Sequence, residues 1–147
     1  MANILYQAGV AKLLAASTTW VAGTWKVLLE RSTSTYAPAK ADATLLNAAG
    51  LVEISVATYA RQTISTPTVA IDNTNSNVAI KCDNVDWGNL ETGQTVKSII
   101  AYLDDGSNGV PLFRIDTDED GLLPRALGGG DFSVTWNAAG VLVFSQA

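Results

Sequence analysis

Short runs of alternating apolar and polar residues, separated by clusters of Asn, Asp, Gly and Ser, dominate the chain after residue 50. Successive side chains of a β-strand point to opposite faces, so these runs predict half-buried strands and the clusters predict turns. Phe132–Trp136 alternates most clearly, whereas the apolar run Val141–Phe144 indicates a strand covered on both faces. The predicted strands are 51–56, 61–65, 68–72, 77–82, 96–103, 111–116, 131–136 and 140–145.

The first 50 residues follow other patterns. Trp25–Glu30 is a run of bulky residues that predicts a central strand. Ile4, Leu5, Ala8 and Ala11 recur at helical spacing and predict a short amphipathic helix near the N-terminus. Residues 42–50 begin with Asp, continue with helix formers and end with Gly, which predicts a second short helix.

These elements predict a mainly β fold, an antiparallel β-sandwich or jelly-roll-like single domain with one or two short helices. We expect residues 1–19 to form an N-terminal arm or short helix, and residues 20–147 to form the sandwich. The total of 147 residues is typical of one domain with its own core.

Charge and composition exclude several catalytic mechanisms and argue against one class of partner. The chain carries 9 Lys and Arg against 14 Asp and Glu, a net charge of −5, and it has no His. Without His, the Ser-His-Asp, Cys-His and zinc-hydrolase mechanisms are excluded within one chain. The negative charge argues against nucleic acid as a partner, because phosphate binding needs a basic face. We expect a protein that is not an enzyme and that needs no cofactor.

The most apolar stretch, Ile4–Ala16, contains Gln7, Gly9 and Lys12 and is shorter than the ~20 residues that span a bilayer. No basic residue precedes Lys12, as a signal peptide would require. We therefore expect no membrane partner and synthesis in the cytoplasm.

The segment Asp116–Gly121 has the opening pattern of a calcium loop, in which alternate carboxylates converge on one cation. The pattern then ends, because its twelfth position is Leu127 instead of Glu. Two interpretations stay open at this stage: a solvated acidic loop, or a calcium site formed by Asp116, Asp118 and Asp120.

Three further features have a functional and a structural interpretation. Asp104 and Asp105 could act with the acidic loop as glycosidase carboxylates, but acidic pairs in turns more often stabilise the turn. Cys82 alternates with Ile80 and fits a core side chain better than a nucleophile, since the chain has no His to activate it. Trp87 lies in the polar segment 83–89, where an aromatic ring could serve as a sugar platform, a subunit contact or a core side chain.

Several short motifs follow one another along the chain: Trp25–Leu29, Tyr36–Pro38, Glu53, Tyr59–Thr63, Asp83–Trp87, Ile99–Tyr102 and Gly129–Gly140. The last of them has the form Phe-x-Val-x-Trp-Asn-x-x-Gly. In this order, from about residue 25 to residue 144, they resemble a family of small virion structural proteins of tailed bacteriophages.

The resemblance implies a structural protein of the phage particle, made in the host cytoplasm, that decorates and stabilises the capsid as a cement protein. Its partner would be the major capsid protein, together with self-association into a symmetric oligomer such as a trimer. A tail, fibre or baseplate component is one alternative, because a fold does not determine a location in the particle. A carbohydrate-binding module that uses Trp87 or Tyr102 as a platform is another.

The N-terminal segment lies outside the resemblance, and its role has two interpretations. It could be an arm that docks on a neighbouring subunit, in which case deletion of residues 1–16 would leave a folded domain that no longer binds capsids. It could instead cover an open edge of its own sandwich. The residues that we expect to contact a partner are Ile4, Leu5, Tyr6, Leu13, Leu14 and Trp87.

Overall fold

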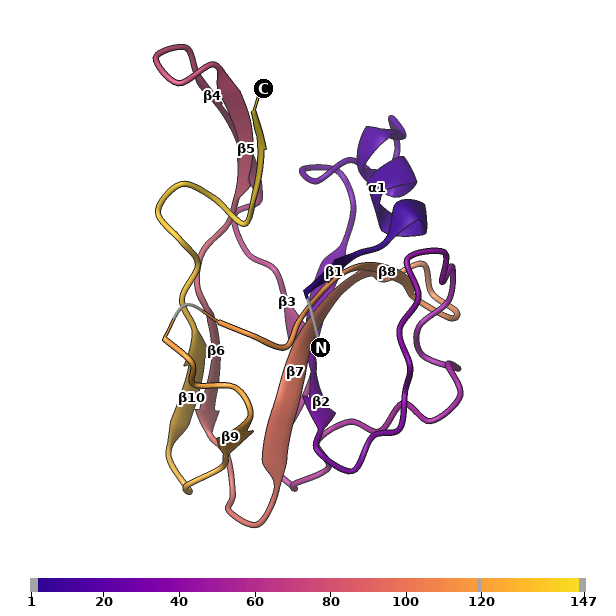
Figure 1. Cartoon of the computed structure of the whole chain (residues 1–147), viewed down its shortest axis with the longest axis vertical. Helices are drawn as coiled ribbons and strands as arrows, with labels where there is room; N and C mark the ends of the chain where they lie inside the picture. Colours follow the sequence, from indigo (N-terminus) through magenta and orange to yellow (C-terminus); the bar gives the residue numbers. More distant parts are fainter. Residues whose placement is uncertain (1–2, 119, 146–147) are drawn as a thin grey trace.

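The computed structural model describes residues 3–118 and 120–145 and shows a mainly β chain with antiparallel sheets and one short helix. This confirms the predicted fold class. In Figure 1 a central sheet lies between a second layer of strands and a long irregular segment, and a narrow sheet projects from one end. Within the described part of the chain, no helix is long and apolar enough to cross a membrane.

The main sheet has the strand order β1–β8–β7–β2–β3, and β9 pairs with the N-terminal end of β7. All of its pairs are antiparallel. Its strands are β1 (Ile4–Leu5), β2 (Trp25–Arg31), β3 (Gln62–Thr63), β7 (Thr95–Leu103), β8 (Val110–Ile115) and β9 (Arg125–Ala126).

The central pair, β2 and β7, is buried on both faces. Val27 and Leu29 point to one face and Leu28 to the other, and none of the three is exposed. Each face therefore has its own core, because a sheet with two apolar faces needs a cover on both sides. The first core contains Val27, Leu29, Ile99 and Ala101 among others, and the second contains Leu28, Tyr36, Leu45, Ile100 and Tyr102.

A second layer covers the first core. Its two strands, β6 (Val85–Asn89) and β10 (Asp131–Val134), pair with each other and contribute Trp87 and Phe132, whose rings meet edge to face at 5.8 Å. The polar segment 83–89, for which the sequence predicts no strand, contains β6. Val85 and Trp87 alternate with exposed residues, so this segment is a half-buried strand despite its polar composition.

The irregular segment between β2 and β3 covers the second core. Its buried Leu45 donates its backbone N–H to the carbonyl oxygens of Asn108 and Gly109, which lie in another loop. The predicted helix over residues 42–50 is therefore wrong: these residues form turns, in which Ala48 donates its N–H to the Leu45 carbonyl oxygen and Leu45 and Leu46 bond to the neighbouring loop. The predicted strand over residues 51–56 is reduced to a single bridge between Glu53 and Glu30.

The other predicted strands are present. Strand 61–65 is shortened to β3, and 96–103, 111–116 and 131–136 correspond to β7, β8 and β10 with small shifts at their ends. The remaining three form the narrow sheet that projects in Figure 1: β4 (Thr68–Asp72), β5 (Asn77–Lys81) and β11 (Leu142–Ser145).

The N-terminal segment belongs to the main domain. β1 extends the main sheet by pairing with β8, and Tyr6, which follows it, is fully buried. Helix α1 (Gln7–Leu14) then packs on β8 so closely that a Cβ on Gly9 would overlap the backbone of Pro111 and Leu112. The predicted helix is confirmed, but a free arm is not: the segment covers an edge of its own sheet.

The close approach at Gly9 generates a prediction for stability. We expect Gly9→Ala to lower the free energy of unfolding by about 1–3 kcal/mol, since the added methyl group meets backbone that has no room to move aside. Urea unfolding measures this change. Gly88→Ala is the matched control, because a Cβ there has no atom within 4 Å. Equal stability of the two variants would contradict the packing of α1 on β8.

Candidate functional site

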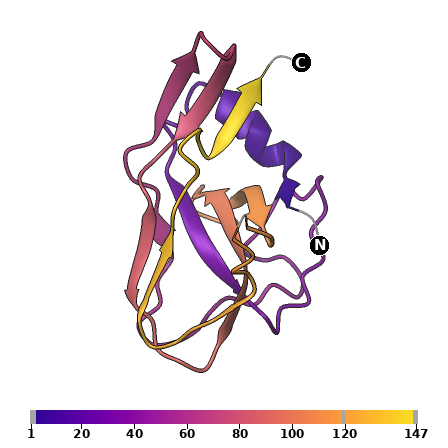
Figure 2. The same ribbon diagram turned by 60° about the vertical axis from the view of Figure 1, so that its left-hand side comes forward.

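The projecting sheet is the candidate functional site. It has the order β4–β5–β11 with β5 in the middle, and it extends away from the main sheet in both views (Figures 1 and 2). The register of its strands places six apolar side chains on one surface in two cross-strand rows, Val69–Ile80–Leu142 and Ile71–Val78–Phe144. We call this surface the apolar face.

The two rows of the apolar face lie in different environments. In the first row Ile80 is 5% exposed and, with Leu142, packs against the first core, whereas Val69 on the edge strand is 52% exposed. In the second row Ile71 is 73% exposed and Phe144 is 48% exposed. Their side chains, with Val78 and polar residues of the β4–β5 turn, line an open hollow of about 480 Å³. The apolar face thus starts over the core and continues into solvent.

The opposite face of the projecting sheet is more polar. Its positions on β4 are Thr68, Ala70 and Asp72. Asp72 also holds the turn, because its Oδ1 accepts hydrogen bonds from the backbone N–H groups of Thr74 and Asn75. The Asn75 side-chain amide and these N–H groups lower the pKa of the Asp72 carboxyl below its usual value. The hairpin therefore ends in an ordered turn, with its carboxylate ionised at neutral pH.

The contact residues expected from the sequence do not form one site. In the N-terminal segment Tyr6 is buried, Ile4 and Leu13 are half-buried, and Leu5 is 38% exposed. Only Leu14, at the end of α1, is largely exposed, at 81%. Trp87 lies in the first core with 3% of its surface exposed, so its ring is not available to a partner in this structure.

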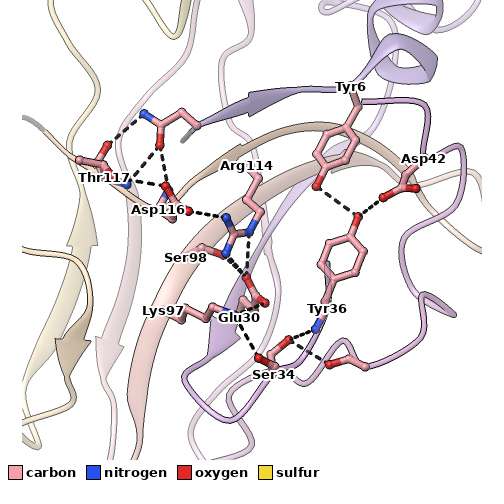
Figure 3. Close-up of polar contacts among 12 residues, drawn as sticks. Tyr6, Glu30, Ser34, Tyr36, Asp42, Lys97, Ser98, Arg114, Asp116 and Thr117 are labelled. Atoms are coloured by element: carbon pink, nitrogen blue, oxygen red, sulfur yellow. Dashed lines mark hydrogen bonds and ion pairs between the residues drawn. The ribbon is translucent and has the colours of Figure 1, made fainter. Parts of the chain in front are cut away.

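A buried group of charged side chains occupies the main sheet (Figure 3). Glu30 on β2 and Arg114 on β8 are both 0% exposed, and Arg114 Nη2 lies 2.9 Å from Glu30 Oε2. Ser98 on β7 donates its hydroxyl to the same Glu30 oxygen, and Arg114 Nη1 donates to Asp116 Oδ2 at 2.7 Å. Lys97 Nζ lies 3.6 Å from Glu30 Oε1.

Beside this group, Tyr6, Tyr36 and Asp42 form a second chain of hydrogen bonds (Figure 3). Tyr36 donates its hydroxyl to Asp42 Oδ2 at 2.8 Å, and its oxygen lies 3.2 Å from the Tyr6 hydroxyl. Burial, together with the hydrogen bonds to Tyr6 and Asp42, raises the pKa of Tyr36 well above its ordinary value. Burial would lower the pKa of Arg114, but its bond to Asp116 and the charge of Glu30 raise it.

These groups hold the fold together and do not form an accessible site. A substrate cannot reach Glu30 or Arg114 without opening the sheet, because neither has exposed surface. The network ties β2, β7 and β8 to one another, and the tyrosines tie the N-terminal segment to the irregular segment after β2. We therefore interpret both as structural.

The described carboxylates of the acidic loop do not lie close enough together to share a cation. Asp116 binds Arg114, and Asp118 Oδ1 accepts the backbone N–H of Leu123. Among residues 3–118 and 120–145, no three His, Cys, Asp or Glu side chains lie close enough to hold a metal ion. The structure thus gives no support to a calcium site at Asp116, Asp118 and Asp120; Glu119 lies outside the described residues.

The remaining candidates take structural roles. Asp104 forms an ion pair with Lys26 at 2.6 Å, and Asp105 accepts the backbone N–H groups of Ser107 and Gly109. Half-buried Cys82 packs against the first core, and burial with the nearby charge of Asp83 raises the pKa of its thiol to about 11, as an inert thiol requires.

The sugar-platform hypothesis fails for both residues that it named. Trp87 is 3% exposed and Tyr102 is 1% exposed, so neither offers a ring face on which a sugar could stack. Trp87 also donates its indole N–H to the Ala60 carbonyl oxygen, which fixes the ring inside the domain.

The buried ion pair generates a second prediction. Arg114→Leu leaves the buried Glu30 with Lys97 as the one cation near it among the described residues, so we expect the free energy of unfolding to fall by about 3–5 kcal/mol. The double variant Glu30→Leu/Arg114→Leu removes both charges and is expected to lose much less. Denaturant unfolding of wild type, both single variants and the double variant measures the coupling. If the double variant were as unstable as Arg114→Leu, the assigned pairing of Glu30 with Arg114 would be wrong.

Comparison with known proteins finds no relative of this chain. No protein-family model, curated protein or solved structure matches the chain. The functional conclusion therefore depends on the residues themselves, and the exposed half of the apolar face is a group of apolar side chains that the described part of the chain leaves uncovered.

Proposed function

We propose that this protein is a non-enzymatic structural subunit of a tailed-phage particle, which decorates and stabilises the capsid by docking through its apolar face. The phage particle is taken from the sequence resemblance, and the observation that carries the docking is the exposed row Ile71–Val78–Phe144 on the projecting sheet. Exposed apolar patches on soluble proteins mark interaction surfaces, and a sheet that extends its apolar side beyond its own core is complete only with a partner.

The charge distribution supports docking on a protein. Asp72 is the single charged residue among the described ones that line the hollow beside the exposed row, although the chain as a whole carries a net charge of −5. Depletion of charge at the centre of a patch is typical of protein interfaces. The acidic remainder would keep free copies soluble and apart before assembly.

A non-enzymatic role agrees with how the polar clusters are used. The buried ion pair of Glu30 with Arg114 is enclosed in the main sheet, and Asp104 and Asp105 stabilise a turn. A decoration protein needs none of these groups for chemistry. It needs a docking surface that is repeated in many copies, since a symmetric shell converts weak single contacts into firm attachment.

A tail, fibre or baseplate component of the same fold is the alternative. It would use the same apolar face, but in the low copy number of a tail part. The number of bound copies per particle therefore distinguishes the two locations.

The test is a pull-down of the purified chain on empty phage heads and, separately, on isolated tails, with bound copies counted on quantitative gels. We expect wild type to bind heads in a ratio set by the shell lattice. Ile71→Asp and Phe144→Asp should weaken binding about tenfold or more, because each places a charge in the contact and each 1.4 kcal/mol is a factor of ten.

Val143→Asp is the matched control. Val143 precedes Phe144 on β11, is 42% exposed and points to the opposite face of the same sheet. The Val143→Asp variant should bind heads as wild type does. Equal binding by all three variants would remove the apolar face from the proposal, and binding to tails alone would move the protein to the tail.

A further inference from the structure

The outer edge of the projecting sheet is unpaired. β4 pairs with β5 on one side, and among the described strands nothing pairs with its other side. Figure 2 shows β4 at the outer edge of the projecting sheet, with β11 on the side nearer α1. A second molecule could therefore approach β4 from outside the domain.

The β4 edge also lacks the usual protection against pairing. Sheets normally shield their edges with very short strands, Lys, Pro or a bulge. The main sheet follows this rule, because β1 and β3 at its two edges have 2 residues each. β4 has 5 residues, no Lys or Pro, and an unbroken register of pairs with β5 from Thr68 to Asp72.

We propose that β4 pairs with β4 of a second copy of this chain, antiparallel and about a two-fold axis at Ala70. The two projecting sheets then become one sheet of six strands. Identical edge strands that meet about a two-fold axis run antiparallel and use the same surface twice, which is the commonest symmetry of soluble oligomers.

The sequence of β4 is self-complementary in this register. With Ala70 opposite Ala70, Val69 of each copy lies opposite Ile71 of the other, and Thr68 lies opposite Asp72. Both Val69–Ile71 pairs fall on the apolar face, where cross-strand aliphatic pairs are stabilising. Each Thr68 hydroxyl faces a carboxylate that can accept its hydrogen bond.

The charges permit a second copy at this edge in spite of the net charge of −5. Asp72 is the single charged residue of β4 and stands at its end. In the proposed register the two Asp72 side chains are four residues apart along the strands, ~14 Å at ~3.4 Å per residue. This exceeds the ~8 Å over which exposed charges interact at physiological salt, so the repulsion between them is weak.

Pairing through the edge leaves the apolar face open and makes it continuous across both copies. In this register each exposed row, Ile71–Val78–Phe144, continues into the Val69–Ile80–Leu142 row of the other copy. The inference does not depend on the identity of the docking partner. It predicts a two-fold assembly, in place of the trimer considered from the sequence.

The first test measures self-association of the purified chain, without any phage component, by sedimentation velocity over a concentration series. We expect a reversible monomer–dimer equilibrium. Ala70→Lys places two like charges directly opposite each other at the axis and should raise the dimer Kd about tenfold or more. Val143→Lys adds the same charge to the same face of the sheet on β11 and should leave the Kd unchanged.

The second test checks the register by disulfide trapping in a Cys82→Ala background, which removes the single native thiol. Ala70→Cys should give a covalent dimer on mild oxidation, because directly opposed residues lie within disulfide distance. Val69→Cys should crosslink far more slowly, since its opposite neighbour is Ile71 of the other copy.

Three results would overturn the proposal. The first is a chain that stays monomeric at high micromolar concentration. The second is a dimer that Ala70→Lys and Val143→Lys weaken equally. The third is a disulfide-linked dimer that forms through Val143→Cys and not through Ala70→Cys, which would assign the contact to β11. Because no phage heads are present, these failures are distinct from failure of the docking proposal.

Discussion

The pairing of β2 with β7, buried on both faces, is the constraint on which the rest of the structure depends. A strand pair with apolar side chains on both sides is stable only when both sides are covered. One cover is the β6–β10 layer with the base of the projecting sheet, and the other is the irregular segment anchored by Leu45. The N-terminal segment then closes the free edge of β8, with Tyr6 buried against it.

The same constraint accounts for the buried charges. Glu30, Ser98 and Arg114 lie on three neighbouring strands, at positions that the covering segments remove from solvent. A buried carboxylate is tolerated only with a cation and hydrogen-bond donors around it, and Arg114 and Ser98 supply them. The network therefore specifies the arrangement of the strands and leaves reactive chemistry no access.

The sequence predicts those parts of the fold that local rules determine. Turns rich in Asn, Asp and Gly mark the ends of β4, β5 and β11, and hydrophobic alternation predicts β4 and β5 to within a few residues. The apolar run Val141–Phe144 predicts β11, but its expected cover on both faces is wrong, because Val143 is 42% exposed and Phe144 is 48% exposed. It misses β6, because polar residues hide the alternation of Val85 and Trp87, and it wrongly predicts a helix where the backbone of Leu45 bonds to a distant loop. Both errors concern contacts between segments far apart in the chain.

The candidate site, too, could be predicted from the sequence only in part. Alternation in β4 and β5 indicates that each strand has an apolar side, but not whether the chain itself covers that side. Only the three-dimensional structure separates Ile80, which lies over the core, from Ile71, which lies beyond it. Because a strand directs side chains to its faces and backbone groups to its edges, β4 can take part in two contacts at once: the backbone around Ala70 forms an edge, while Ile71 belongs to the apolar face. In the proposed dimer Ile71 also lies beside Val69 of the other copy, so the self-association and docking surfaces meet at this side chain, whereas Phe144 belongs to the docking surface alone.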